Sequence, residues 1–94
     1  MAIVLIPGVL RERAQGQESV EVPGKTVREV LEGLVQRYPG LRGRILDEGG
    51  QLHSFLSVMV DQCEIVSLSD EVGPDSEVVI VPALGGGVPS LDGT

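Results

Sequence analysis

Apolar and polar positions follow two different periods along this chain, and together they predict a fold of mixed α and β structure. Residues 27–38 carry apolar side chains at intervals of three and four, which places one continuous stripe on a single helical face. Thr26 is a favourable N-cap, Glu29 completes a capping box, and Pro39-Gly40 ends the segment. Gly33 costs about 1 kcal/mol relative to alanine inside a helix, so we attribute it to close packing against a neighbour.

Short apolar stretches on both sides of this helix predict β-strands. Residues 2–7 are apolar on both faces, which is typical of a central strand that is covered at least in part on each side. A polar turn connects them to residues 18–22, which alternate strictly, so we predict a hairpin. After the helix, residues 55–60 are a strand candidate and residues 63–66 a short partner strand. Residues 77–81 contain four consecutive β-branched side chains and predict a final buried strand.

The order of these elements is a hairpin, a helix, a strand, a short strand and a final strand. The first and last strands are the most apolar, so we place them side by side at the centre of one sheet. With the hairpin and helix between them as a crossover, these two strands must run parallel. The sequence thus predicts an α+β domain of β-grasp (ubiquitin-like) architecture over residues 1–82. Its mixed sheet has four to five strands, and the one main helix packs on one face.

The carboxyl end has a different pattern, because the final strand leads into glycines. Pro82 lacks an N–H and ends the strand, and residues 83–87 (ALGGG) offer little that could anchor in a core. Such an arm suits a narrow site in another protein, where a Cβ would clash. A flexible tail is the alternative that this stretch leaves open. Residues 88–94 form a further C-terminal extension.

Strand parity in the final strand predicts a second surface. Glu77 should face water, so Val79 and Val81 share its side while Val78 and Ile80 face the helix. Exposed valines beside the glycine arm would form a partner-docking surface. Ordinary sheet surface is the alternative.

Composition narrows the class of function. The net charge of −7, from 14 acidic and 7 basic residues, makes nucleic acid an unfavourable partner and favours a partner with a basic docking surface. The basic residues are six arginines and one lysine, Lys25. No apolar run approaches the roughly 20 residues of a membrane span, and the amino end lacks the flanks of a signal peptide. We therefore expect a cytoplasmic protein that does not associate with membranes.

Side chains that could carry catalysis are few. His53 is the one histidine and makes neither a metal site nor a catalytic triad, so we interpret it as a surface or boundary residue. For Cys63, the single cysteine, we favour a packing role over a sulfur relay. Residues 85–87 lack the Gly-Lys-Ser/Thr of a phosphate loop, and the loop carboxylates lack calcium-loop spacing. We predict no catalytic residue, no metal site and no cofactor.

Four segments give the chain a resemblance to a known family. They are residues 37–41 (RYPGL), 52–55 (LHSF), 58–61 (VMVD) and 82–84 (PAL), the last running into the glycines. Their order and spacing, over nearly the whole of residues 1–87, resemble the ThiS/MoaD sulfur carriers, closest to carriers of the CysO and QbsE type. The resemblance implies a protein co-substrate and not an enzyme.

The resemblance also implies a reaction and its partners. An E1-like adenylating enzyme activates the terminal glycine carboxylate with ATP, and a sulfur donor displaces AMP to leave a thiocarboxylate. A sulfur-accepting synthase then takes the sulfur in cysteine, thiamin, molybdopterin or thio-natural-product biosynthesis. Spacing from Pro82 assigns the adenylation and thiocarboxylate site to Gly87, with Gly86 as the alternative. The arm that threads into the partner comprises Leu84, Gly85 and Gly86.

The extension after the glycines departs from the family pattern. Carriers that work directly end at Gly-Gly, whereas here the carboxylate of Gly87 is held in the peptide bond to Val88. In the QbsE-type branch, a zinc-dependent JAMM-type metallopeptidase removes such a tail, so we expect proteolysis to remove residues 88–94. Two other functions stay open. One is a ubiquitin-like modifier joined to lysines through the same glycine, and the other is a plain β-grasp binding module.

Overall fold

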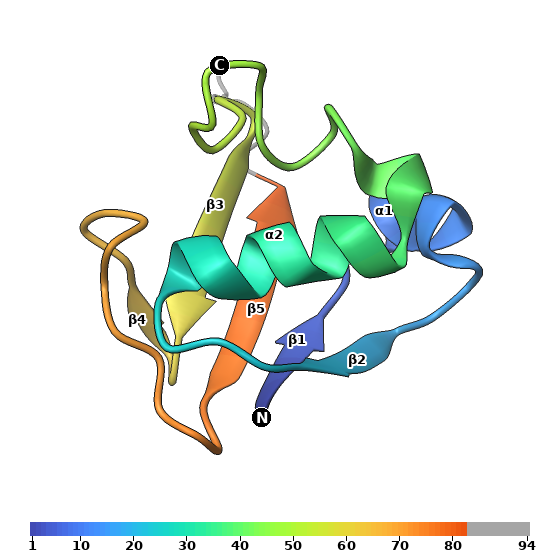
Figure 1. Cartoon of the computed structure of the whole chain (residues 1–94). Helices are drawn as coiled ribbons and strands as arrows, with labels where there is room; N and C mark the ends of the chain where they lie inside the picture. The colour runs from blue at the N-terminus through green and yellow to red at the C-terminus, as the bar shows by residue number, and fades with distance from the viewer. Residues whose placement is uncertain (83–94) are drawn as a thin grey trace, which may run out of the picture.

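The computed structural model describes residues 1–82, which form a five-stranded sheet with a long helix across one face (Figure 1). The strands are β1 (Ala2–Leu5), β2 (Ser19–Val22), β3 (Leu56–Val60), β4 (Cys63–Glu64) and β5 (Glu77–Pro82). The helices are α1 (Gly8–Arg11) and α2 (Val27–Arg37), with 3₁₀ turns η1 (Glu12–Ala14) and η2 (Pro39–Leu41). The predictions for the glycine arm and the extension, residues 83–94, lie outside the described residues.

The strand order β2-β1-β5-β3-β4 places the first and last strands at the centre of the sheet, as the sequence predicts. β1 and β5 run parallel, with Val4 opposite Val78, and the other pairs are antiparallel. A parallel pair needs a crossover connection, which β2 and α2 supply. The predicted β-grasp fold class is therefore confirmed.

Helix α2 packs its apolar stripe against the sheet. Its residues Val27, Val30, Leu31 and Leu34 are buried in one core with side chains from the central strands. A Cβ on Gly33 would lie 2.9 Å from the Cγ1 atom of Val22, so close packing does account for this glycine. No helix within residues 1–82 is long and apolar enough to span a membrane.

The N-terminus of α2 differs in one detail from the predicted capping box. The Oγ1 atom of Thr26 accepts a hydrogen bond from the backbone N–H of Glu29 at 3.2 Å, as expected. The reciprocal bond starts one residue earlier, because Glu29 Oε1 accepts from the backbone N–H of Lys25 at 2.8 Å. Both bonds satisfy backbone N–H groups around the first turn.

Residues 8–17 correct the sequence prediction, because α1 and η1 occupy much of the predicted polar turn. Leu10 and Ala14 are buried in the core. Two anchors four residues apart reach the same core when the backbone between them is helical. The charged residues between the anchors conceal this spacing in the sequence.

The β4 region also differs from the prediction of a strand over residues 63–66. Only Cys63 and Glu64 pair with β3, and Val66 is 93% exposed. The backbone N–H of Val66 bonds to Asp70 Oδ2 at 2.7 Å, which turns the chain away from the sheet. Cys63 is exposed, so the prediction that it packs in the interior is wrong. Because β4 is an edge strand of only two residues, little of the fold lies close enough to cover the Cys63 side chain.

Candidate functional site

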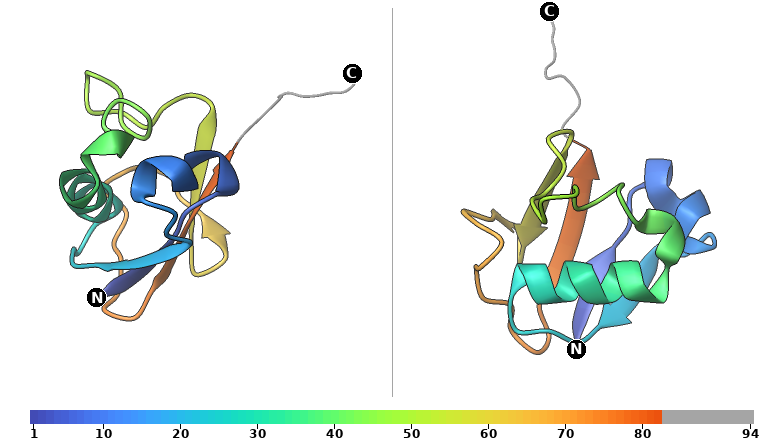
Figure 2. Two further views of the ribbon diagram at one scale, coloured as in Figure 1. Left: turned by 90° about the vertical axis from the view of Figure 1, so that its right-hand side faces the viewer. Right: turned by 45° about the horizontal axis from the view of Figure 1, so that its top comes forward.

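The site begins where β5 ends. Pro82 lies opposite Leu56, the first residue of β3. Because β1 and β5 are parallel, β5 ends at the same end of the sheet where β1 leads into α1. Both views of Figure 2 place α1 and the end of β5 at this common end. Whatever follows Pro82 therefore departs from a defined position beside α1.

The start of β5 is held by Asp61, in the turn after β3. Asp61 Oδ1 accepts from the backbone N–H of Glu77 at 3.0 Å, and Oδ2 accepts from the Ser76 hydroxyl at 2.8 Å. The Glu77 bond first and the Ser76 bond second hold the pKa of Asp61 below its ordinary value, against a smaller opposing effect of desolvation. These contacts stabilise the register of β5, and a slip of one residue would exchange its two faces.

The faces of β5 follow the predicted parity. Val78 and Ile80 are buried beneath the helix side, whereas Val79 and Val81 are half-buried. The neighbours of Val79 in the sheet are Leu5 on β1 and Met59 on β3. Directly opposed residues of neighbouring strands share a face, so these side chains lie together on the face away from α2.

A contiguous apolar surface thus covers the middle of the open face. It joins residues from three strands, and we call it the open-face patch: Ile3, Leu5, Met59, Val79 and Val81. Ile3 is 40% exposed, and the other four are half-buried. An apolar surface that is this accessible suits a protein partner better than a small polar ligand.

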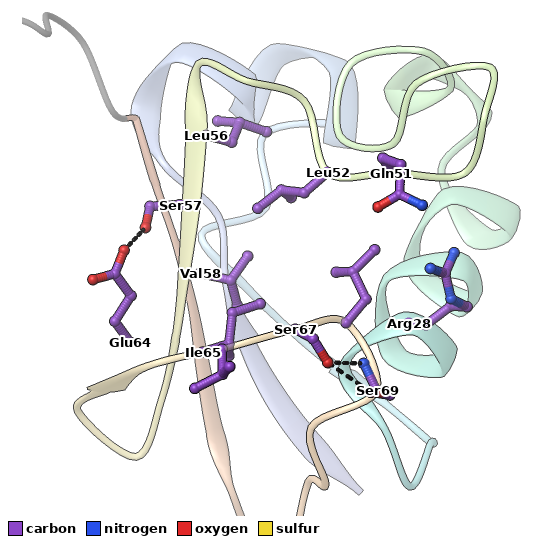
Figure 3. A pocket seen from close by; sticks show the side chains of 12 residues that line it. Arg28, Gln51, Leu52, Leu56, Ser57, Val58, Glu64, Ile65, Ser67 and Ser69 are labelled. Carbon is purple, nitrogen blue, oxygen red and sulfur yellow. Dashed lines mark hydrogen bonds between the residues drawn. The ribbon is translucent and has the colours of Figure 1, made fainter.

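Glutamates border the open-face patch. Glu21 and Glu77 flank Ile3 on the two neighbouring strands, and Glu64 lies beside Met59. Glu64 Oε2 accepts a hydrogen bond from the Ser57 hydroxyl at 3.0 Å, and Figure 3 shows this pair on the outer side of β3. An apolar centre with an acidic border fits a partner surface that has an apolar centre and a basic rim.

The sequence predicts Val79 and Val81 for this surface but misses Ile3, Leu5 and Met59. The available signal is the apolar character of both faces of β1, which a central buried strand also explains. Whether the outward face of β1 is exposed or buried depends on which elements cover each side of the sheet. α2 covers the side of Val4, and no described element buries Ile3 to the same degree.

The other side of β3 borders a cavity of about 540 Å³ between β3, the loop after β4 and α2 (Figure 3). Leu52, Leu56, Val58 and Ile65 supply much of its apolar wall. Arg28 lines it as well, and its Nη1 donates to Gly50 O at 2.5 Å. Polar side chains line it too, and they are bonded to one another, Ser57 to Glu64 and Ser67 to Ser69.

The remaining candidate residues stand apart from this surface. His53 is half-buried and packs on Phe55 with ring centroids 4.5 Å apart, which agrees with the boundary position predicted for it. Residues 1–82 contain no group of three His, Cys, Asp or Glu side chains that could hold a metal ion. The sites assigned to Leu84, Gly85, Gly86 and Gly87 lie outside the described residues.

Comparison with known proteins places this architecture in a family. The ThiS family model matches residues 4–87. The chain belongs to the ThiS family. The sulfur carrier proteins CysO of Mycobacterium tuberculosis and Mycobacterium bovis are each 33% identical to it over 89 residues, which is 89% of this chain and 96% of theirs. The resemblance predicted from the sequence is thus confirmed.

Solved structures agree with this assignment to the ThiS family. A chain of the Amycolatopsis orientalis BexX/CysO complex is similar with a TM-score of 0.83 and 33% identity, over 93% of this chain and 100% of that one. Mycobacterium tuberculosis CysO gives a TM-score of 0.81 and 30% identity, over 89% and 100% of the two chains. SAMP1 of Haloferax volcanii gives 0.75 and 26%, over 92% and 98%.

Proposed function

We propose that this ThiS-family chain is a sulfur carrier whose C-terminal glycine, exposed by tail removal, is adenylated and then converted to a thiocarboxylate. The observation that carries the proposal is the end of the family match, which stops at Gly87 and leaves residues 88–94 outside. The similarity to sulfur carriers over nearly the whole chain supports the same class. The protein is then a co-substrate and not an enzyme, since the reacting group is its own main-chain terminus.

Two substitutions at the carboxyl group make up the chemistry. An oxygen of the Gly87 carboxylate attacks the α-phosphorus of ATP, and pyrophosphate leaves as the acyl-adenylate forms on an E1-like adenylating enzyme. Hydrosulfide supplied by the sulfur donor then attacks the acyl carbon, the bond to AMP breaks, and a thiocarboxylate remains. Glycine carries no Cβ beside this carbon, so both attacks meet little steric resistance. A sulfur-accepting synthase in cysteine, thiamin, molybdopterin or thio-natural-product biosynthesis takes the sulfur.

The folded body positions this terminus for a partner. Leu84, Gly85 and Gly86 form the arm that enters the partner's active site, and from Pro82 to Gly87 an extended chain reaches about 15–20 Å. Val79 and Val81, with the rest of the open-face patch, dock against the partner outside. The complex of a similar CysO chain with BexX supports binding of this general kind.

Residues 88–94 act as an inactivating cap in this proposal. While Gly87 is in a peptide bond it has no carboxylate to activate, so hydrolysis by a JAMM-type metallopeptidase precedes adenylation. Gly86 is the alternative terminus if cleavage occurs one residue earlier. Because adenylation needs ATP, the proposal places the protein in the cytoplasm.

The experiment compares three forms of the chain, ending at Thr94, Gly87 and Gly86. Each is incubated with the adenylating enzyme of the same organism, ATP and sulfide, and then read by intact mass and a thiol-selective probe. We expect a thiocarboxylate on the form that ends at Gly87 and none on the form that ends at Thr94. Equal reaction of the full chain, or no reaction of any form, would contradict the proposal.

A second candidate function is protein modification through the same glycine. The observation in its favour is the similarity to SAMP1, at 26% identity over 92% of this chain. SAMP1 stands for small archaeal modifier protein 1. A modifier forms isopeptide conjugates in cells, which mass spectrometry detects as target lysines that carry the C-terminal peptide of the modifier. Trypsin leaves this peptide long, because no lysine or arginine follows Arg44. Chains of this modifier would have to grow through Lys25, its one lysine.

A further inference from the structure

Two aromatic side chains lie at the end of the sheet where β5 finishes, and the proposed function gives neither of them a role. His53 and Phe55 belong to a tight turn before β3, which a hydrogen bond from the N–H of Leu56 to His53 O closes at 3.0 Å. We call residues 53–56 the aromatic turn. Its last residue is the pairing partner of Pro82. Consecutive Cα atoms are about 3.8 Å apart, so Phe55 lies beside the origin of the arm.

The aromatic turn is fixed to the core of the protein at both ends. The N–H of His53 donates to the carbonyl oxygen of Ile45 at 2.9 Å, and the Ile45 side chain is fully buried. Leu56 is buried at the other end of the turn. The rings of His53 and Phe55 pack with centroids 4.5 Å apart and a tilt of 54°, which is a favourable aromatic pairing. The Phe55 ring is therefore held in place before a partner arrives.

This ring remains accessible although its neighbour in the chain is not. Phe55 is 37% exposed, whereas Leu56 is 5% exposed and points to the cavity side of β3 (Figure 3). A single exposed apolar side chain is ordinary on a protein surface. Phe55 differs because it is held rigidly and because only Ser57, the partner of Val81, separates its strand position from the open-face patch.

The length of the arm brings Phe55 against an enzyme that receives the arm. An extended chain from Pro82 to Gly87 reaches about 15–20 Å, so a reacting carbon in a deep site draws the end of the sheet against the entrance. The Cα atoms of Phe55 and Pro82 lie within about 10 Å of each other, because one peptide unit and one strand pairing connect them through Leu56. The wall of the entrance thus meets the Phe55 ring.

We propose that Phe55 inserts into an apolar pocket in the wall of the active-site entrance of the enzyme that adenylates the arm. The inference rests on the proposed function, and it adds a contact residue and the chemistry of the surface that receives it. A ring that is already fixed gains apolar contact on binding with little further loss of conformational entropy. Buried aromatic side chains of this kind contribute a large share of the binding energy of interfaces. His53 is a positioning residue, since its ring packs on Phe55.

The pocket that fits the aromatic turn is apolar and has polar groups only at its border. Residues 52–58 contain no aspartate, glutamate, lysine or arginine. One carboxylate approaches this segment, that of Glu64, which accepts a hydrogen bond from the Ser57 hydroxyl. One guanidinium belongs to Arg44, an exposed residue next to Ile45 in the chain. The two opposite charges offset each other, so the apolar ring and not a net charge is what the partner recognises.

The first test observes this ring directly. Phe55 is the only phenylalanine in the sequence, so para-fluorophenylalanine labels this position alone. The labelled form that ends at Gly87 is mixed with the unlabelled adenylating enzyme of the same organism, and fluorine NMR is recorded with a soluble paramagnetic agent. We expect the resonance to shift and to become protected from the agent in the complex. A resonance that stays accessible in the enzyme-bound carrier would overturn the inference. A shift caused by ATP alone would assign the ring to the nucleotide and would also overturn it.

The second test measures adenylation of variants of the same form by ATP–pyrophosphate exchange. Phe55→Ala should raise the KM for the carrier about tenfold and leave kcat unchanged, because the reacting glycine itself is intact. His53→Ala should raise KM about threefold, since the Phe55 ring loses its support. Phe55→Leu keeps an apolar side chain and should recover most of the loss. The matched control is Val66→Ala, which truncates a side chain that is 93% exposed beyond β4 and should keep the wild-type KM.

Urea unfolding shows that each variant is folded under the assay conditions, and Phe55→Leu tests the contact if the alanine variant does not fold. Equal KM values for Phe55→Ala and Val66→Ala, or a loss in kcat alone, would overturn the inference. A wild-type carrier that is adenylated while Phe55→Ala keeps its KM removes only this inference. A wild-type form that is never adenylated removes the proposed function together with it.

Discussion

Two polar side chains, Asp61 and Ser76, lie at the end of the sheet where β5 begins and fix which face of β5 is buried. Asp61 has a positive φ of 51° and ties the turn after β3 to the first residues of β5 through two accepted hydrogen bonds. Ser76, which is buried, donates one of these bonds and accepts another from the N–H of Gly73 at 2.9 Å. The open-face patch thus depends on a polar network that lies outside the apolar core.

This network predicts a pH-dependent contribution to stability. The pKa of Asp61 is lowered in the folded protein. Its stabilisation is therefore complete above the unfolded pKa of about 3.9 and is lost as the pH falls through the folded pKa. We expect Asp61→Asn to unfold at lower urea concentration than the wild type at pH 7, with a smaller difference between the two proteins at about pH 3. Asparagine tolerates positive φ, so the turn itself survives.

Urea unfolding at the two pH values measures this difference. The other carboxylates contribute equally to the pH dependence of both proteins, so their effect cancels in the comparison. A stability gap that stays constant with pH would contradict a role for the Asp61 charge.

Gly33 gives a second prediction for a single residue. Alanine normally stabilises a helix interior by about 1 kcal/mol relative to glycine. Here its Cβ would meet Val22, which is nearly fully buried, so overpacking should reverse the sign and lower the free energy of unfolding by about 1 kcal/mol. A double-mutant cycle with Val22→Ala, read by urea unfolding, checks the cause. Gly33→Ala should cost less in the Val22→Ala background, and equal costs would exclude this contact as the reason.

The elements of the fold depend on one another through the parallel pair at the centre. β1 and β5 can be neighbours because β2 and α2 form the crossover between them, and α2 then covers the face that contains Val4 and Val78. The start of α2 is therefore important beyond the helix itself. Thr26 is its N-cap and also forms an isolated bridge with Glu71, in the loop before β5.

Removal of this cap should weaken the whole body. We expect Thr26→Ala to lower the free energy of unfolding by about 1 kcal/mol, because the N–H of Glu29 loses its side-chain acceptor. Thr26→Ser keeps the hydroxyl and should stay close to the wild type in urea unfolding. If serine destabilises as much as alanine, the methyl group of Thr26 and not the cap is responsible.

At the scale of the whole molecule, the open-face patch and the end of β5 at Pro82 lie next to each other, because Val81 belongs to both. In the proposed function, the sheet presents this apolar area to a partner enzyme and the chain beyond Pro82 supplies the reacting group.

The patch predicts that docking and folding can be separated by mutation. Val81→Gln in the form that ends at Gly87 should lower kcat/KM for adenylation about tenfold, because it puts a polar group into the apolar contact. Ser19→Gln places the same side chain on the open face of the outer strand β2 and is the matched control. Both variants should keep the circular dichroism spectrum of the wild type. An equal loss of activity in the two variants would show that Val81 has no special place in docking.

Much of this architecture follows from local patterns in the sequence. The stripe of α2, its cap and the inward side of β5 are all set by the spacing of residues close together in the chain, and the structure confirms them. The central parallel pair also follows, since only two strands are apolar throughout. The helical path of α1, with Leu10 and Ala14 as anchors, is missed because arginines and a glutamate separate them.

The surface proposed to bind partners could be recognised only from the folded structure. Ile3, Leu5 and Met59 join Val79 only through strand register, and no pattern within one strand predicts which neighbours flank it. The exposure of Cys63 depends on how briefly β4 pairs with β3. Periodicity along the chain specifies which side of an element is buried, whereas contacts between distant segments specify which exposed side chains lie together.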